Sequence, residues 1–188
     1  IYNMVNVALD WHRFDWDPDE TWRKTTLPKL GALGIKDKVL SRSVYVLRLN
    51  GNFCIEYPWG QSPVLYIGEG RFGQRINAHR AWVTELEELV GDFSFQVCIA
   101  MPRVRNSPNT YRDCEAALLN RFREKFGSAP MWNKQFESRL FDYEYNQRQM
   151  DQALCKRSGA RYKWAVAPMK SSGFYKNFVR THAAQAAA

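Results

Sequence analysis

The chain has 188 residues, a hydrophobic fraction of 45% and a formal net charge of +8, with seven Trp and eleven Phe. This length and composition exclude a disordered chain and suit one domain, or one domain with extensions at both ends. The excess of basic residues favours polyanionic partners, chiefly nucleic acid. Proteins that bind no polyanion also carry such a charge for solubility, so charge alone does not decide the partner.

The four cysteines are Cys54, Cys98, Cys114 and Cys155, and the chain has three His. No Cys-x-x-Cys pair is present, so we expect no structural zinc site. Widely spaced cysteines indicate reduced thiols, which predicts a cytoplasmic protein. We recognise no signal peptide and no apolar run long enough to cross a bilayer, so we expect no membrane partner.

Residues 1–42 are expected to form a mostly helical arm that packs on the core. The stretch 15–20 holds Pro18 among acidic residues, which indicates a turn followed by the start of a helix. Trp22 and the leucines after it recur at spacings that suit one apolar helix face. The same arm offers a place for a substrate-binding surface.

Two strands and a helix are predicted next. Residues 43–50 are rich in β-branched and aromatic side chains, and residues 64–68 form a second short apolar run. Because a modest loop joins them, the two strands are expected to be antiparallel neighbours. That loop, 51–62, is interpreted either as a DNA-contacting insertion or as plain surface. A helical pattern follows from about 74 to 89.

A third strand and two further helices complete the pattern. Residues 92–101 alternate between apolar and polar side chains, as in a strand with one buried face. A helix over 110–126 is expected to begin with Thr110 and Asp113 as a near capping box. Another helix is expected at about 136–154.

The order strand, strand, helix, strand, helix predicts an α+β fold with a small three-stranded sheet. The chain is expected to divide into a helical arm (1–42), a central module (43–136), a helical and basic C-terminal extension (137–182) and a short tail (183–188).

The C-terminal extension includes a basic stretch, 156–180, with seven Lys and Arg, no Asp or Glu, and interleaved aromatic residues. It fits a clamp on a DNA backbone with stacking groups. The alternative is a surface extension held to the core by its aromatic residues. The candidate phosphate contacts in the stretch are Lys156, Arg157, Arg161 and Lys163.

Single residues of the central module carry little information by themselves. Glu115 shares a helix stripe with apolar residues, where a carboxylate is costly unless it is paired or holds a metal; a helix-start acid favoured by the helix dipole is the ordinary explanation. Arg75 and His79 are four apart and project on one helix face, where they could bind a phosphate, although a solvated basic face is more common. Tyr45 and Tyr66 could serve only for packing.

In their joint order these residues resemble the GIY-YIG nuclease superfamily. Tyr66-Ile67-Gly68 matches the second tripeptide of that name, whereas Ser43-Val44-Tyr45 keeps only the Tyr of the first. An Arg, a Glu and an Asn follow in the superfamily's order. The Arg-x-x-x-His spacing is most similar to the restriction endonucleases of the superfamily. The resemblance covers residues 43 to about 136, and its matched residues are Tyr45, Tyr66, Arg75, His79, Glu115 and Asn133.

The resemblance implies a three-stranded antiparallel sheet flanked by helices, and an endonuclease that hydrolyses phosphodiester bonds in double-stranded DNA. Glu115 would ligate Mg²⁺ or Mn²⁺, and Arg75 would hold the scissile phosphate. Tyr45 would deprotonate or orient the attacking water. Tyr66 and His79 would bond the phosphate or that water. Asn133 would support the site from its loop.

Several alternatives remain open from the sequence. A restriction-type or defence-related enzyme is the main hypothesis; a mobile-element nuclease, a toxin nuclease, an RNA-directed nuclease and a non-catalytic nucleic-acid-binding module are the others. Arg71 is interpreted equally as a phosphate contact or as a solvated turn residue. A homodimer is expected if the target is palindromic, because a two-fold target favours a two-fold protein.

Overall fold

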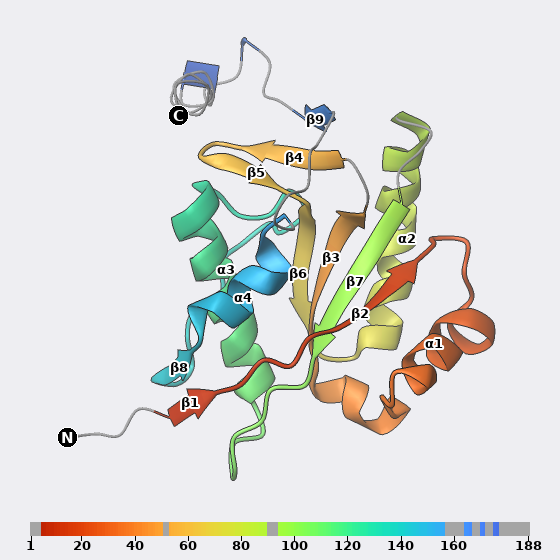
Figure 1. Cartoon of the computed structure of the whole chain (residues 1–188), viewed down its shortest axis with the longest axis vertical. Coiled ribbons are helices and arrows are strands. Elements are labelled where there is room, and N and C mark those ends of the chain that lie inside the picture. The colour runs from red at the N-terminus through yellow and green to blue at the C-terminus, as the bar shows by residue number, and fades with distance from the viewer. Residues whose placement is uncertain are drawn as a thin grey trace.

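The computed structural model describes residues 5–50, 53–89, 94–156, 164–166, 170–171 and 175–176. An antiparallel sheet of four strands, in the order β2-β7-β3-β6, lies at its centre, with helices around it (Figure 1). The protein is therefore α+β with an antiparallel central sheet. The four strands are β2 (His12–Trp16), β3 (Val44–Asn50), β6 (Val64–Glu69) and β7 (Ser94–Ala100).

The fourth strand corrects the expected three-stranded sheet. Strand β2 comes from the N-terminal arm and pairs with β7 along its whole length, with Phe14 and Trp16 buried. The alternation over five residues is a strand signal, but charged residues between the aromatic ones hide it. The helical part of the arm is short: η1 (Trp22–Thr26), α1 (Leu27–Ala32) and η2 (Asp37–Arg42).

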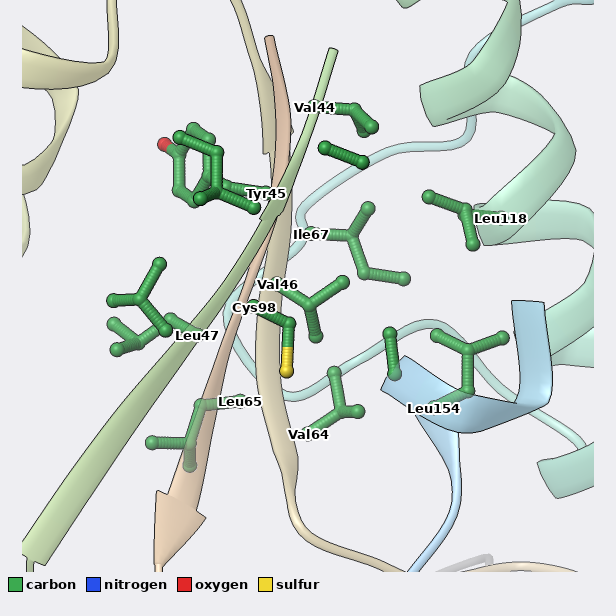
Figure 2. Close-up of a cluster of buried hydrophobic side chains, with 14 of the residues drawn as sticks. Val44, Tyr45, Val46, Leu47, Val64, Leu65, Ile67, Cys98, Leu118 and Leu154 are labelled. Atoms are coloured by element: carbon green, nitrogen blue, oxygen red, sulfur yellow. The ribbon is translucent and has the colours of Figure 1, made fainter. Parts of the chain in front are cut away.

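Both faces of the sheet are covered, so the central strand β3 is buried over residues 44–49. In Figure 2, Tyr45 and Leu65 lie on one side of the sheet, whereas Ile67 lies on the other side, toward Leu118 and Leu154. Burying strands on both faces removes a large apolar area from water, which is the main stabilising contribution to such a core. The helices that carry these contacts are α2 (Phe72–Leu89), α3 (Thr110–Phe126) and α4 (Gln147–Leu154).

The start of α3 differs from the expected capping box. Asn109 is the N-cap residue and makes no side-chain cap hydrogen bond, while Thr110 Oγ1 donates to the carbonyl of Ser107. The carboxylate of Asp113 is fully buried and accepts from the backbone N–H groups of Leu140 and Phe141. Asp113 therefore stabilises a tertiary contact between α3 and residues 140–141 rather than the start of the helix.

The helix expected at 136–154 begins only at residue 147. Asn146 caps α4 by accepting from Gln149 N, and residues 136–142 are irregular. The bonds to Asp113 hold that irregular segment against α3 and prevent it from continuing the helix. Between the two lies β8 (Tyr143–Tyr145), which pairs in parallel with β1 (Val5–Val7).

The loop expected at 51–62 contains a hairpin instead of plain coil. Its strands are β4 (Phe53–Tyr57) and β5 (Gly60–Ser62), and β9 (Trp164–Val166) adds to β4 in parallel. Tyr57 Oη donates to the carbonyl of Val64, which ties this small sheet to the central one. Across the described ranges, no helix combines the length and apolar character needed to cross a bilayer.

Candidate active site

A cavity of about 680 Å³ lies beside β6, one of the two edge strands of the central sheet. Strand β6 contributes Tyr66, α2 contributes Arg75, α3 contributes Glu115, and the segment after α3 contributes Asn133. The fold thus brings four of the residues singled out from the sequence to one cavity, although they are spread over 68 positions of the chain, from 66 to 133.

Tyr45 and His79 form a buried pair directly beneath Tyr66. Tyr45 Oη lies 2.9 Å from His79 Nε2, and neither residue lines the cavity. The His79 ring centroid is 4.4 Å from that of Tyr66, and the Tyr45 ring packs edge-on against Phe72 at the start of α2. The site therefore has an outer layer that lines the cavity and an inner layer that supports Tyr66.

Gly68 has to be glycine because both tyrosine rings cover it. A Cβ atom at this position would lie 2.5 Å from Tyr66 Cε1 and 2.7 Å from Tyr45 Oη, closer than real Cβ contacts come. The Tyr-Ile-Gly spacing is thus a packing requirement in this chain: the glycine makes room for the Tyr45–Tyr66 contact.

Trp82 fixes the tautomer of His79. Its Nε1 donates to His79 Nδ1 at 3.1 Å, and an indole N–H can only donate. The proton of the neutral imidazole must then lie on Nε2, so His79 donates to the hydroxyl oxygen of Tyr45. Burial, and after it Arg75, lower the pKa of His79 to about 4, which keeps the ring neutral at neutral pH.

Asn133 holds the backbone of β6. Its Oδ1 accepts from Ile67 N at 2.9 Å, and its Nδ2 donates to Ile67 O at 2.8 Å. One amide side chain therefore bonds the edge of the sheet as a neighbouring strand would. This contact sets the position of the strand next to Tyr66, so Asn133 both lines the cavity and orients its wall.

The residues that line the cavity include three basic and three acidic side chains: Arg75, Arg112 and Lys134 with Glu69, Glu115 and Glu137. Burial raises the pKa of Glu115 to about 8, with Glu69 and Glu137 adding to the effect and Arg75 opposing it. Without a cation, Glu115 is therefore mostly protonated at neutral pH.

The donor set fits a hard divalent cation held by few protein ligands. The described residues include no group of three or more His, Cys, Asp or Glu placed to bind a metal together. Mg²⁺ needs only one or two carboxylates, with water and phosphate oxygens completing its shell. The half-buried Glu115 carboxyl in an open cavity, with two more carboxylates near it, meets that requirement.

The phenols retain their protons in this arrangement. Burial raises the pKa of Tyr45 well above its ordinary value, with Tyr66 adding and Arg75 opposing. Burial also raises the pKa of Tyr66, again against Arg75. A base role for Tyr45 therefore requires extra positive charge at the cavity.

Of the predicted DNA contacts, Arg71 and Lys156 are described, and neither lines the cavity. Arg71 is exposed at the start of α2, where its carbonyl accepts from Gln74 N and Arg75 N, and it does not line the cavity. Lys156 follows α4. Arg157, Arg161 and Lys163 lie outside the described residues.

Several cavity residues escape sequence reasoning. Arg112 is three positions before Glu115 on α3, and this helical spacing could have revealed it. Glu69 directly follows Tyr-Ile-Gly, and no spacing relates it to the other site residues. Glu137 lies in an irregular segment, which has no periodic pattern to mark it. Trp82 lies behind the cavity rather than in its lining, and its place three residues after His79 on a helix could have indicated the contact between them.

Comparison with known proteins adds no relative to this picture: no family model, no curated protein and no solved structure matches the chain.

Proposed function

We propose that the chain is a divalent-metal-dependent endonuclease of the GIY-YIG kind that hydrolyses phosphodiester bonds in double-stranded DNA. Its catalytic module would span residues 43–136, and a restriction-type or defence role is the one we favour. One observation supports this most: Tyr66, Arg75, Glu115 and Asn133 share one cavity, with the Tyr45–His79 pair beneath it.

Phosphate binding falls to the cations of the cavity. The guanidinium of Arg75 suits two oxygens of the scissile phosphate and offsets the charge that grows on them in the transition state. Arg112 lines the same cavity and provides a second guanidinium. Glu115 would hold Mg²⁺ or Mn²⁺, with water and phosphate oxygens as the other ligands. The bound ion supplies polarisation of the phosphoryl oxygens.

Orientation of the attacking water falls to Tyr66, which lines the cavity and can hold a water against the phosphorus atom. Tyr45 is buried and does not line the cavity, so its role would be carried through Tyr66, whose ring centroid lies 6.0 Å from that of Tyr45. Burial raises the pKa of Tyr45, and Arg75 opposes that rise, as a cation at Glu115 would.

A cleavage assay tests the proposal directly. Purified protein is incubated with plasmid DNA and Mg²⁺, with EDTA and the Glu115→Gln variant as controls. Glu124→Gln, an exposed change on the same helix, is the matched variant. We expect cleavage by the parent and by Glu124→Gln, and a loss of at least about 100-fold for Glu115→Gln.

The products and the controls distinguish the remaining readings. Discrete fragments indicate a restriction enzyme, a smear indicates a nonspecific nuclease, and DNA binding without cleavage indicates a non-catalytic module. If Glu115→Gln cuts as fast as the parent, the metal-ligand role is wrong.

Two further parts of the proposal concern the compartment and the assembly of the protein. The four cysteines are free thiols in the structure, which suits a reducing compartment such as the cytoplasm. A homodimer would match a palindromic target. A sedimenting monomer that cuts both strands in one event would count against the dimer.

A further inference from the structure

Among the described residues that line a second cavity, of about 440 Å³, the charged ones are all cationic. Segment 37–42 contributes Lys38, Ser41 and Arg42, and the segment after β7 contributes Arg103 and Ser107. Three cations without a carboxylate repel one another, and this arrangement is stabilised when an anion binds between them. The catalytic cavity differs, because its three cations face three carboxylates.

A hydroxyl in this cavity lacks a partner. Ser107 Oγ is shielded from solvent and makes no hydrogen bond to any residue that the structure describes. The turn that carries it is well defined: Ser107 N donates to Val104 O, and Asn106 adopts a positive φ of 62°. A buried hydroxyl without a partner is costly, and an oxyanion in the cavity would satisfy it.

The second cavity lies at the same end of the central sheet as the catalytic one. Val44, the first residue of β3, pairs with Glu69 of β6 and with Ala100 of β7. Residues 37–42 directly precede β3, and residues 101–107 directly follow β7. Both segments that line the second cavity therefore adjoin the strand ends that pair next to Glu69, and Glu69 lines the catalytic cavity.

Gly70 lies between the chain segments that carry the two cavities. Its N–H donates to Ser43 O at 2.9 Å, and a Cβ atom built on it would lie 3.8 Å from Tyr111 and 4.0 Å from Ser41 O. Ser41 lines the second cavity, and Tyr111 precedes Arg112 of the catalytic cavity. A nucleic-acid strand that crosses this end of the sheet would meet both.

We propose that the cavity formed by Lys38, Arg42, Arg103 and Ser107 binds a non-scissile backbone phosphate of the nucleic acid that is cut at Glu115. This inference rests on the proposed function. The catalytic cavity places acidic side chains beside its cations, whereas the charged residues that line the second cavity are all cationic. A phosphate held in the second cavity therefore adds affinity for the polyanion and fixes the register of the strand without reading its sequence.

The test measures DNA binding separately from cleavage. Binding of a fluorescent duplex is followed by anisotropy in EDTA, on the Glu115→Gln background, over a series of salt concentrations. One variant carries Lys38→Ala, Arg42→Ala and Arg103→Ala. The matched control carries Arg23→Ala, Lys24→Ala and Arg148→Ala, which removes the same charge from exposed positions that line neither cavity. Thermal unfolding of all proteins verifies that each variant is folded.

We expect the cavity variant to bind duplex DNA roughly 10- to 100-fold more weakly than the control, as for loss of a charge-assisted contact. The slope of log K against log salt should fall by about 0.9, the contribution of one phosphate. A third variant, Ser107→Ala, should weaken binding without changing that slope. The same affinity and slope in cavity variant and control would overturn the inference.

Two further outcomes are distinguishable. If inorganic phosphate raises the melting temperature of the parent but not of the cavity variant, while DNA affinity is unchanged, the ligand is a small anion and the inference fails. If the parent never cleaves DNA but its binding depends on the cavity, the nuclease proposal fails and the phosphate site stands.

Discussion

At the scale of single residues, the indole of Trp82 determines what His79 can do. A neutral imidazole has one proton, and the bond from Trp82 places it on the side of Tyr45. Trp82 does not touch the cavity contents in our proposal; it acts through His79 and Tyr45. Its ring also stacks on Trp132, with centroids 4.6 Å apart, so a substitution has to preserve that contact.

Trp82→Phe should keep the stacking and lose the hydrogen bond. We expect kcat to fall by roughly 10- to 100-fold, as when an orienting partner of an active-site His is removed, with little change in KM. The ¹⁵N chemical shifts of His79 should move toward a mixture of tautomers. Trp59→Phe, at a Trp that is 51% exposed, is the control. Unchanged His79 shifts in Trp82→Phe would refute the tautomer assignment.

Glu115 predicts an unusual dependence of stability on pH. Its pKa is about 8 in the folded, metal-free protein and 4.5 as the ordinary value, because burial and then Glu69 and Glu137 disfavour its charge. Between these values the folded state binds more protons than the unfolded state. The contribution of Glu115 to stability is therefore fully present below about pH 4.5 and is lost as the pH rises from 4.5 to 8.

Urea denaturation in EDTA at several pH values measures this effect. His79 shifts stability in the opposite direction, but only between its pKa of about 4 and the ordinary 6.5, so the window from pH 6.5 to 8 isolates Glu115. The free energy of unfolding should fall through this window in the parent and stay nearly flat in Glu115→Gln. Parallel curves for the two proteins would refute the raised pKa.

Sequence reasoning works for residues that carry a motif and fails for those that only share the cavity. Tyr66, Arg75 and Glu115 could be singled out because chain order relates them. Glu137 could not, since it reaches the cavity through an irregular segment with no periodicity. The burial of Tyr45 behind Tyr66 was also invisible, because a strand pattern tells which residues share a face but not which ring lies outermost.

At the scale of elements, Asp113 joins α3 to the segment that closes the cavity. Its buried carboxylate accepts from Arg139 Nε and from the backbone N–H groups of Leu140 and Phe141, and Tyr145 Oη donates to it at 2.9 Å. Burial raises the pKa of Asp113, but these bonds, from Arg139 first, outweigh it and lower the pKa overall. The carboxylate is thus held charged inside the protein.

Asp113→Asn should destabilise the protein by about 1.5–3 kcal/mol, the range for hydrogen bonds to a charged group. Cleavage should fall as well, because Asp113 holds the backbone at Leu140 and Phe141, and the cavity-lining residues between 134 and 140 belong to the same segment. Chemical denaturation measures the first effect, and Asp142→Asn, an exposed neighbour, is the control. If both variants unfold at the same urea concentration, the anchor contributes nothing.

The elements predicted best are those with strong periodicity. Strands near 43–50, 64–68 and 92–101 and helices near 74–89 and 110–126 all exist, with ends shifted by a few residues. Strand β2 was not predicted because it has only five residues, some of them charged, and the longer helical pattern beside it dominates this part of the sequence. Of the helix predicted at 136–154, only residues 147–154 are helical. The first half is irregular and is hydrogen-bonded to Asp113 of α3, a tertiary contact that no local pattern reveals.

At the scale of the whole molecule, the N-terminal arm is part of the central sheet. Strand β2 pairs along β7 and buries Phe14 and Trp16. Removing residues 1–17 should bare the β7 edge and the apolar surface beneath it, which favours strand addition between molecules. We expect aggregation of the shortened protein during light scattering at micromolar concentration. A monodisperse shortened protein with full stability would show that β2 is dispensable.

The amide of Asn133 also limits how two copies of this chain could associate. It hydrogen-bonds both the N–H and the carbonyl of Ile67, and Trp132 N donates to the carbonyl of Leu65. The backbone groups on the outer side of β6 are therefore already hydrogen-bonded at these positions. A strand from another molecule could dock there only by displacing residues 132 and 133, and that would dismantle the pocket wall. A two-fold assembly that keeps the pocket wall intact would therefore form away from the outer side of β6, and its interface could be mutated without displacing Asn133.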